Sequence, residues 1–343
     1  MSFCGFQSVT DIKSLYFKLR EPVRLNPHVS KTIYLLQSLR YSNFGSFRKK
    51  VVAARRTSAE GQGVALCCRI RDEARYLVEF VEYYLAAGIA HFFFYEKLSL
   101  DNFAEVLAPY IDRGVVSLYA DWPNVPVSPS AEQDCLLKCI GRFSWVGFID
   151  ADEFVVIRDG GSIGEFLSAY EHYPAVALHW LIFGSNGHKK RPEGPVISEY
   201  TRRHLEPSKH VKCFVKPKSA ANYRNSHSWF YRGMRCAVNE LGRKVTGSIS
   251  MPPTAQRAWI NHYHHKSDED YFEKAARKSV LDTVMMKFEN RTLERHVKSE
   301  ASNNAVSDEA AIEYYLKRCR VLARKPILAA ASRASAAYNG ERD

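Results

Sequence analysis

Residues 145–154, Trp-Val-Gly-Phe-Ile-Asp-Ala-Asp-Glu-Phe, join an apolar run to a cluster of acidic side chains. The apolar residues up to Ile149 are typical of a buried strand, and the acids begin where that strand is expected to end. In an extended segment alternate side chains point the same way, so Asp150 and Asp152 can face one ion. Carboxylate oxygens suit Mg²⁺ or Mn²⁺, which share further positions with phosphate oxygens. Two acids at a strand end can equally cap the next turn, and both interpretations stay open.

The chain before this stretch alternates between short apolar segments and segments whose apolar residues have helical spacing. Such an order with short connections predicts an α/β fold, in which helices wind around an open parallel sheet. We expect strands at 64–70, 91–95, 115–119 and 145–149, and helices between them at 76–87, 102–112 and 131–142.

Acidic residues follow all four predicted strands, although the chain carries a formal net charge of +12. Ligands of wound sheets bind beyond the carboxyl ends of the strands. A cation or a hydroxyl-rich ligand is therefore expected at this edge. The acidic residues are Asp72 and Glu73, next to Arg71, after the first strand, Glu96 and Asp101 after the second, Asp121 after the third, and Asp150, Asp152 and Glu153 after the fourth.

A second cluster, residues 259–267, places three histidines, a lysine and a serine after another apolar segment. His262 could complete a metal site, while Lys266 and Ser267 could hold phosphate oxygens. Alternation places His262 and His264 on one face and His265 on the other. Surface histidines that merely precede an acidic helix start remain the alternative.

The segment 183–188 reads as a glycine-rich loop after a predicted strand at 176–182. Its two glycines permit close backbone approach. The spacing matches neither a phosphate-binding P-loop nor a dinucleotide-binding motif. His227 is an isolated histidine, for which a structural role is the simpler interpretation.

The composition indicates a globular protein of 343 residues, 46% of them hydrophobic, and eight cysteines lack the paired spacing of a zinc site. We expect a basic N-terminal extension at 1–60, a main domain at 61–325 and a loosely held tail at 326–343. Apolar residues between 304 and 324 predict a helix that packs on the main domain. No apolar run is long enough to span a membrane, so a cytoplasmic protein is expected. The basic extension could hold it at the inner face of a membrane.

Several blocks, in order, resemble glycosyltransferase family 92 and related family-2-like bacterial transferases. The resemblance runs from about residue 63 to 320. Its blocks are Glu73-Ala74 with 76–85, Gly88 and 91–95, then 106–111, Gln133 with Cys135, 145–154, 183–188 with 191–194, 260–263, and Lys266-Ser267.

The resemblance implies a GT-A fold, in which a wound mixed sheet is flanked by helices, here with helical extensions at both ends. It also implies a nucleotide-diphosphate sugar donor, usually a uridine one, and an inverting transfer aided by Mn²⁺ or Mg²⁺. The acceptor would be a saccharide or a lipid-linked glycan, with no nucleic-acid partner.

Site roles follow from the resemblance residue by residue. Asp152 and Lys266 would carry the chemistry, and Asp150, Asp152 and His262 would hold the metal. The general base stays open among Glu199, Asp268 and Asp270, since Glu240 looks like part of a hairpin turn. The donor side would comprise Arg71, Asp72, Glu73, Glu96, Asp101, Gln133, Asp150, Ala151, Lys266 and Ser267, and the acceptor side Gly184, Ser185, Gly187, His188 and His227.

Two blocks depart from the family pattern. The chain has Arg71-Asp72-Glu73 where the family usually has Lys-Asn-Glu, and residues 95–101 depart from Tyr-Asp-Asn-x-Ser-x-Asp. A non-catalytic protein that binds sugar nucleotides therefore remains an alternative. A basic nucleic-acid-binding protein fits less well, because the strand ends are acidic.

Overall fold

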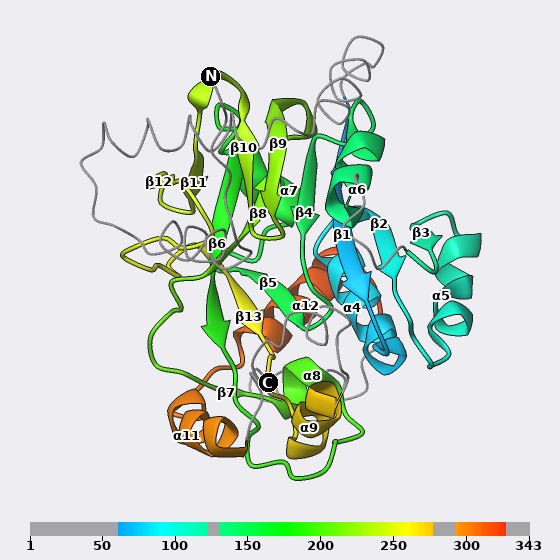
Figure 1. Cartoon of the computed structure of the whole chain (residues 1–343), viewed down its shortest axis with the longest axis vertical. Coiled ribbons are helices and arrows are strands. Elements are labelled where there is room, and N and C mark those ends of the chain that lie inside the picture. The colour runs from blue at the N-terminus through cyan, green and yellow to red at the C-terminus, as the bar shows by residue number, and fades with distance from the viewer. Residues whose placement is uncertain (1–60, 123–129, 277–292, 327–343) are drawn as a thin grey trace, which may run out of the picture. The chain divides into compact units, whose positions relative to one another are not determined.

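The computed structural model describes residues 61–122, 130–276 and 293–326 (Figure 1). All of them belong to one unit of the chain, Phe44–Asp343. The predicted extension at 1–60 and the tail beyond residue 326 lie outside the described residues, so the predicted domain boundaries stay predictions.

The described residues build one large mixed sheet with the strand order β12-β11-β6-β8-β4-β1-β2-β3, while β13 pairs with both β5 and β6. The first four strands, β1 (Val64–Ile70), β2 (Ile89–Glu96), β3 (Val116–Tyr119) and β4 (Trp145–Phe148), pair in parallel as predicted. The strand β8 (Val211–Val215) runs antiparallel between β4 and β6 (Ala175–Ile182), which makes the sheet mixed.

The remaining strands extend this sheet or form small pairs of their own. At one edge β11 (Ala237–Asn239) joins β12 (Lys244–Val245) through a turn that contains Glu240, as the sequence predicts. The antiparallel pair β5 (Glu153–Ile157) and β13 (Ala258–His262) adjoins β6. Two further pairs are β9 (Ala220–Asn225) with β10 (Ser228–Tyr231), and β7 (Arg202–Arg203) with β14 (Val306–Ser307).

Helices cover both faces of the sheet. Leu66 of β1 belongs to one buried cluster with Phe80 of α4 (Ala74–Ala86), while its neighbour Cys67 belongs to another with Cys135 of α6 (Ala131–Cys139). Burial on both faces explains why the strands read as continuous apolar runs rather than alternating ones. The other α-helices among the described residues are α5 (Phe103–Asp112), α7 (Ile163–Ser168), α8 (Val196–Glu199), α9 (Asp268–Ala276), α11 (Leu293–Asn303) and α12 (Ala310–Val321).

The helix α12 packs on the main domain, as its apolar spacing predicts. Ile312, Tyr315 and Cys319 are buried against α4 and β5, whereas Leu322, expected on the same side, is 41% exposed just past the helix end. None of the helices in the described ranges is long and apolar enough to cross a membrane.

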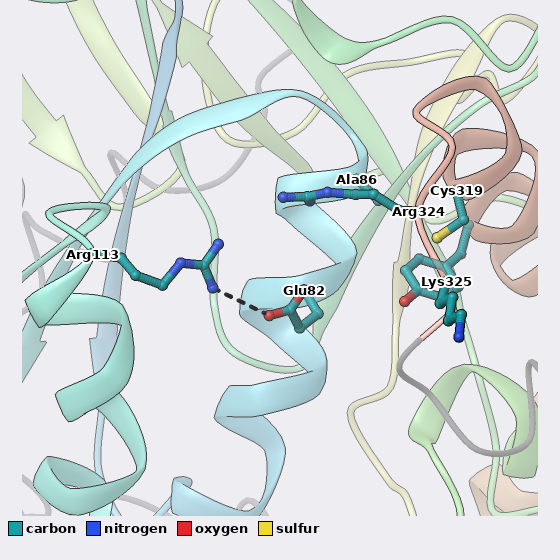
Figure 2. Close-up of a pocket in the computed structure, with 7 residues that line it drawn as sticks. Glu82, Ala86, Arg113, Cys319, Arg324 and Lys325 are labelled. Carbon is teal, nitrogen blue, oxygen red and sulfur yellow. Dashed lines mark ion pairs between the residues drawn. The ribbon is translucent and has the colours of Figure 1, made fainter.

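A cavity of about 300 Å³ lies where α4, α5 and α12 end (Figure 2). Arg113, Arg324 and Lys325 line it, each just beyond the last residue of a helix or a few residues later. Helix C-termini carry partial negative charge, which cations stabilise. The carboxylate of Glu82 accepts a hydrogen bond from Tyr110 Oη at 3.0 Å and faces Arg113 at 3.8 Å. These basic residues therefore stabilise the C-terminal ends of the helices. The cavity lies at the C-terminal end of α4, whereas Glu73 lies at the N-terminal end of that helix.

Candidate active site

The acidic stretch after β4 is a tight turn and not an extended segment. The chain turns at Ala151–Asp152 and enters β5 at Glu153. The backbone N–H of Asp150 donates to Glu153 Oε2 at 2.9 Å, and the N–H of Glu153 donates to the Asp150 carbonyl at 3.0 Å. The expectation of alternating side chains is therefore wrong here, because the turn gives Asp150 and Asp152 different surroundings.

Asp150 faces a buried lysine. Lys212 of β8 is 1% exposed, and its Nζ lies 2.8 Å from Asp150 Oδ2 and 3.5 Å from Glu153 Oε2. Burial lowers the pKa of Lys212, but the two carboxylates reverse this effect and raise it above the ordinary value. Burial also raises the pKa of Glu153 well above its usual range. Nothing in the sequence around Lys212 signals this role.

Asp152 belongs to a separate cluster with His262 and His264. One ligand atom from each of the three lies within 4.8 Å of the others. The pairing of β13 with β5 sets His262 opposite Glu153, and the Tyr263 N–H donates to the Asp152 carbonyl at 2.8 Å. His264 lies with His262 in this cluster, as the alternation of side chains predicts, and Asp150 is not part of it.

The chemistry of this cluster fits a divalent cation. Asp152 and His262 are 5% and 7% exposed, and Asp152 Oδ1 lies 3.6 Å from His262 Nε2. The other ring nitrogen of His262, Nδ1, is buried with no hydrogen-bond partner in the described part of the chain. Burial raises the pKa of Asp152, yet the neighbouring charges of Lys274 and His262 hold it well below its usual range. An ionised carboxylate beside imidazole nitrogens is a suitable ligand set for such an ion.

Aromatic rings form one wall of the cluster. The Trp180 ring of β6 lies 4.4 Å from the His262 ring, 5.4 Å from His210 and 5.3 Å from His227, between centroids. His227 Nδ1 donates to the Val211 carbonyl at 2.9 Å, since a carbonyl can only accept. Burial, helped by the charge of Lys212, lowers the pKa of His227 to about 4. His227, predicted on the acceptor side, is therefore an oriented neutral ring.

Lys266 is buried, and its backbone lies in the left-handed region, with φ of 54°. Its Nζ lies 3.7 Å from the centroid of the Tyr76 ring and 3.8 Å from Glu73 Oε2. Burial lowers the pKa of Lys266, although the nearby negative charge of Glu73 acts to raise it. A non-glycine residue in this region is strained, and such strain gathers at functional sites.

The next residues fix the start of α9. Ser267 Oγ donates to Asp270 Oδ2 at 2.7 Å and accepts from the Asp270 N–H at 3.1 Å. The other carboxylate oxygen of Asp270 accepts from Tyr76 Oη at 2.5 Å and from Arg191 Nε at 2.6 Å. These hydrogen bonds outweigh burial and lower the pKa of Asp270. Ser267 and Asp270 thus have a structural role in the described structure.

The other two base candidates differ in their partners. Asp268 Oδ2 forms an ion pair with Lys189 Nζ at 2.9 Å. Glu199 ends α8, and its backbone carbonyl accepts a hydrogen bond from His188 Nε2 at 3.1 Å. Its carboxylate oxygen Oε2 lies 3.8 Å from the same nitrogen, beyond hydrogen-bonding distance. The helix α8 is held in place by Glu79 of α4, whose carboxylate accepts the N–H groups of Val196 and Ile197 at 2.8 and 3.0 Å.

The acids after β1 and β2 cross-link two loops. Asp101 Oδ2 accepts from the Ala74 N–H and Asp72 Oδ1 from the Leu100 N–H, each at 2.7 Å. Glu96 accepts from the Ser99 and Asp121 N–H groups at 2.5 and 3.0 Å. Hydrogen bonds thus join the two segments that depart from the family pattern, residues 71–73 and 95–101, to each other.

Two other residues that are predicted to bind the sugar donor have partners close by in the sequence. Arg71 Nε lies 3.8 Å from Asp72 Oδ2. Gln133 Oε1 accepts from the Ser130 N–H at 3.0 Å in a capping box that starts α6, while its buried Nε2 has no hydrogen-bond partner among the described residues.

The glycine-rich loop packs on α11. A Cβ at Gly184 would lie 2.5 Å from Asn304 Oδ1, and Ser185 Oγ donates to Glu300. Gly187, with φ of 80°, donates its N–H to Ser185 Oγ at 2.9 Å. The loop is therefore ordered by its own contacts, and Gly184 and Ser185 face α11.

A family model described as glycosyltransferase family 92 matches residues 63–311 of this chain. The chain belongs to glycosyltransferase family 92. A family 92 protein from Ricinus communis is 29% identical over 228 residues, which cover 64% of this chain and 39% of that protein. One from Oryza sativa subsp. japonica is 30% identical over 164 residues, which cover 46% of this chain and 27% of that protein. The chain thus spans less than half the length of these relatives.

Solved structures that are similar to this chain at low TM-scores include two in complex with sugar nucleotides. One is TarS 1-349 of S. aureus in complex with UDP-GlcNAc (11% identity, TM-score 0.34, 76% of this chain and 73% of that one). The other is the mannosyltransferase PcManGT from Pyrobaculum calidifontis in complex with GDP-Man and Mn²⁺ (12% identity, TM-score 0.33, 91% and 92%). At these TM-scores no residue role transfers to the family 92 chain.

Proposed function

We propose that this family 92 chain transfers a sugar from a nucleotide-diphosphate donor to a hydroxyl group of a saccharide or lipid-linked glycan, with inversion at the sugar. The observation that carries the proposal is the cluster of Asp152, His262 and His264, which the turn after β4 and the end of β13 bring together. A divalent cation, Mn²⁺ or Mg²⁺, would be held there and would offset negative charge on the departing diphosphate.

The chain's own residues supply the remaining functions. Lys266, held between Tyr76 and Glu73, adds a positive charge on the same side as Asp152. Its burial strengthens its interaction with an anionic leaving group. Asp150 keeps a 43% exposed side chain, oriented by Lys212, that can accept hydrogen bonds from ribose hydroxyls.

Glu199 is the proposed general base. Asp270 accepts hydrogen bonds from Tyr76, Arg191 and Ser267, and Asp268 pairs with Lys189. A carboxylate that is already hydrogen-bonded is a weaker proton acceptor, so these contacts favour Glu199.

The donor base is proposed to be uracil on the family resemblance alone. Peripheral contact with the inner face of a membrane is proposed from the net charge of +12.

A thermal-shift titration tests the proposal. The full chain is heated with UDP, GDP and several UDP-sugars, each with Mn²⁺ and with a chelator. We expect stabilisation that needs nucleotide and metal together, because a ligand that binds only the folded state raises its stability. If no nucleotide stabilises the protein with Mn²⁺, the donor assignment fails and the binding-site acids are structural.

A further inference from the structure

The carboxylate of Asp152, a proposed metal ligand, already binds the ammonium group of a lysine. Lys274 lies on α9, and its Nζ is 2.5 Å from Oδ2 of Asp152, a residue 122 positions earlier in the chain. The other oxygen of Asp152 faces His262 Nε2 at 3.6 Å. A single buried carboxylate thus lies between an ammonium group and an imidazole of the proposed metal cluster.

In this arrangement Lys274 binds Oδ2 of Asp152, while Oδ1 faces His262 of the cluster. The cluster offers one ligand atom from each of its three residues, and the carboxylate is its only anionic member. A divalent cation that draws its ligand from Asp152 would meet the Lys274 ammonium at close range, where like charges repel. Metal binding is therefore expected to weaken or break the contact between Lys274 and Asp152.

Lys274 can move without unfolding its surroundings. Its side chain is 32% exposed, whereas that of Asp152 is 6% exposed. A lysine has a long flexible stem, so its charged end can rotate into solvent while its helix stays in place. Asp152 has no such freedom, because the Tyr263 N–H binds its carbonyl and β5 begins at the next residue.

We propose that Lys274 is an exchangeable internal counterion, which neutralises Asp152 in the metal-free protein and is displaced when a divalent cation binds. This inference rests on the proposed metal site. It assigns Lys274 a positioning role: it keeps the ionised carboxylate in place before the metal arrives, and it sets how tightly the metal binds.

The test measures Mn²⁺ binding to the full chain by isothermal titration calorimetry, without nucleotide, and the melting temperature in chelator. The variant Lys274→Met should bind Mn²⁺ roughly tenfold more tightly, the size expected when a charge-assisted hydrogen bond no longer has to be broken. Its metal-free form should melt at a lower temperature, and Mn²⁺ should restore the loss. Lys274→Arg, which keeps the charge, should bind Mn²⁺ about as weakly as the wild type.

A matched control is Lys189→Met, which removes an ion pair to Asp268 at the start of the same helix. It should leave Mn²⁺ affinity unchanged. Equal or weaker Mn²⁺ binding by Lys274→Met, or by Lys274→Gln if the Met variant does not fold, would overturn the inference while the metal site stands. Absence of Mn²⁺ binding to the wild type, or full binding to Asp152→Asn, would overturn the metal assignment together with this inference.

Discussion

The ammonium group of Lys212, whose side chain is 1% exposed, lies 2.8 Å from Oδ2 of Asp150. It also faces the fully buried carboxylate of Glu153 at 3.5 Å. Two strands, β8 and β4, thus bring a cation to the base of the acidic turn. Removal of one partner of a buried ion pair leaves an uncompensated charge, which makes Lys212 the first residue to test.

Lys212→Met should lower the free energy of unfolding by about 1.5–3 kcal/mol, because Asp150 loses its charge-assisted hydrogen bond to the buried lysine. Urea denaturation followed by circular dichroism measures this. Lys216→Met is the control, since its partner Glu171 is 55% exposed. That pair should contribute no more than about 1 kcal/mol. Equal losses in the two variants would show that burial does not strengthen the Lys212 contacts.

Asp152→Asn should reduce sugar transfer at least about 100-fold, because the site loses the anionic ligand that anchors the cation. Far-UV circular dichroism should remain that of the wild type. Asp112→Ala, at an exposed acid that ends α5, is the control and should be fully active. Normal turnover by a folded Asp152→Asn protein would refute the metal assignment.

Glu199→Gln should lower kcat by about 100-fold or more while the donor Kd stays unchanged, since a general base acts only in the chemical step. Single-turnover kinetics and a separate donor titration distinguish the two effects. Glu193→Gln, an exposed acid in the preceding segment, should have no effect. A change confined to donor affinity would assign Glu199 to binding instead.

His227 makes stability depend on pH. Its pKa is lowered to about 4, so between pH 6.5 and 4 the unfolded chain binds a proton that the folded protein does not. Stability therefore falls as pH drops through this window. From pH 7 to 5 the loss should be about 2 kcal/mol at most.

Denaturation at both pH values compares the wild type with His227→Gln, which should lose less stability on acidification. The exposed His172 is the control, because His172→Gln should behave as the wild type. Parallel pH profiles for the wild type and His227→Gln would show that this ring does not carry the effect.

The parallel half of the sheet could be predicted because its signals are local. Apolar runs bounded by glycine and helical spacing place β1 to β4 and α4 to α6 within a few residues of their observed bounds. The inserted antiparallel strand β8 could not be placed, since its position depends on pairing with β4 and β6 across the chain.

For the site, too, local signals could be predicted from the sequence, whereas contacts between distant residues could not. His262 and Asp152 could be paired from their residue types and the family resemblance, and the alternation of histidines already pointed to His264. Lys212 and Lys274 could not be found, because they meet Asp150 and Asp152 across 62 and 122 residues. The carboxylate of Asp101, predicted to bind the donor, accepts a hydrogen bond from the Ala74 N–H at the start of α4, a contact that no spacing reveals.

The helix α4 holds two distant parts of the chain with side chains one turn apart. Tyr76 binds Asp270, 194 residues away, and Glu79 binds the N–H groups that begin α8. One inserted or deleted residue between them would rotate one contact by about 100° relative to the other. Homologous chains that keep both contacts can therefore vary the residues between Tyr76 and Glu79 but not their number, so insertions and deletions should fall outside this turn.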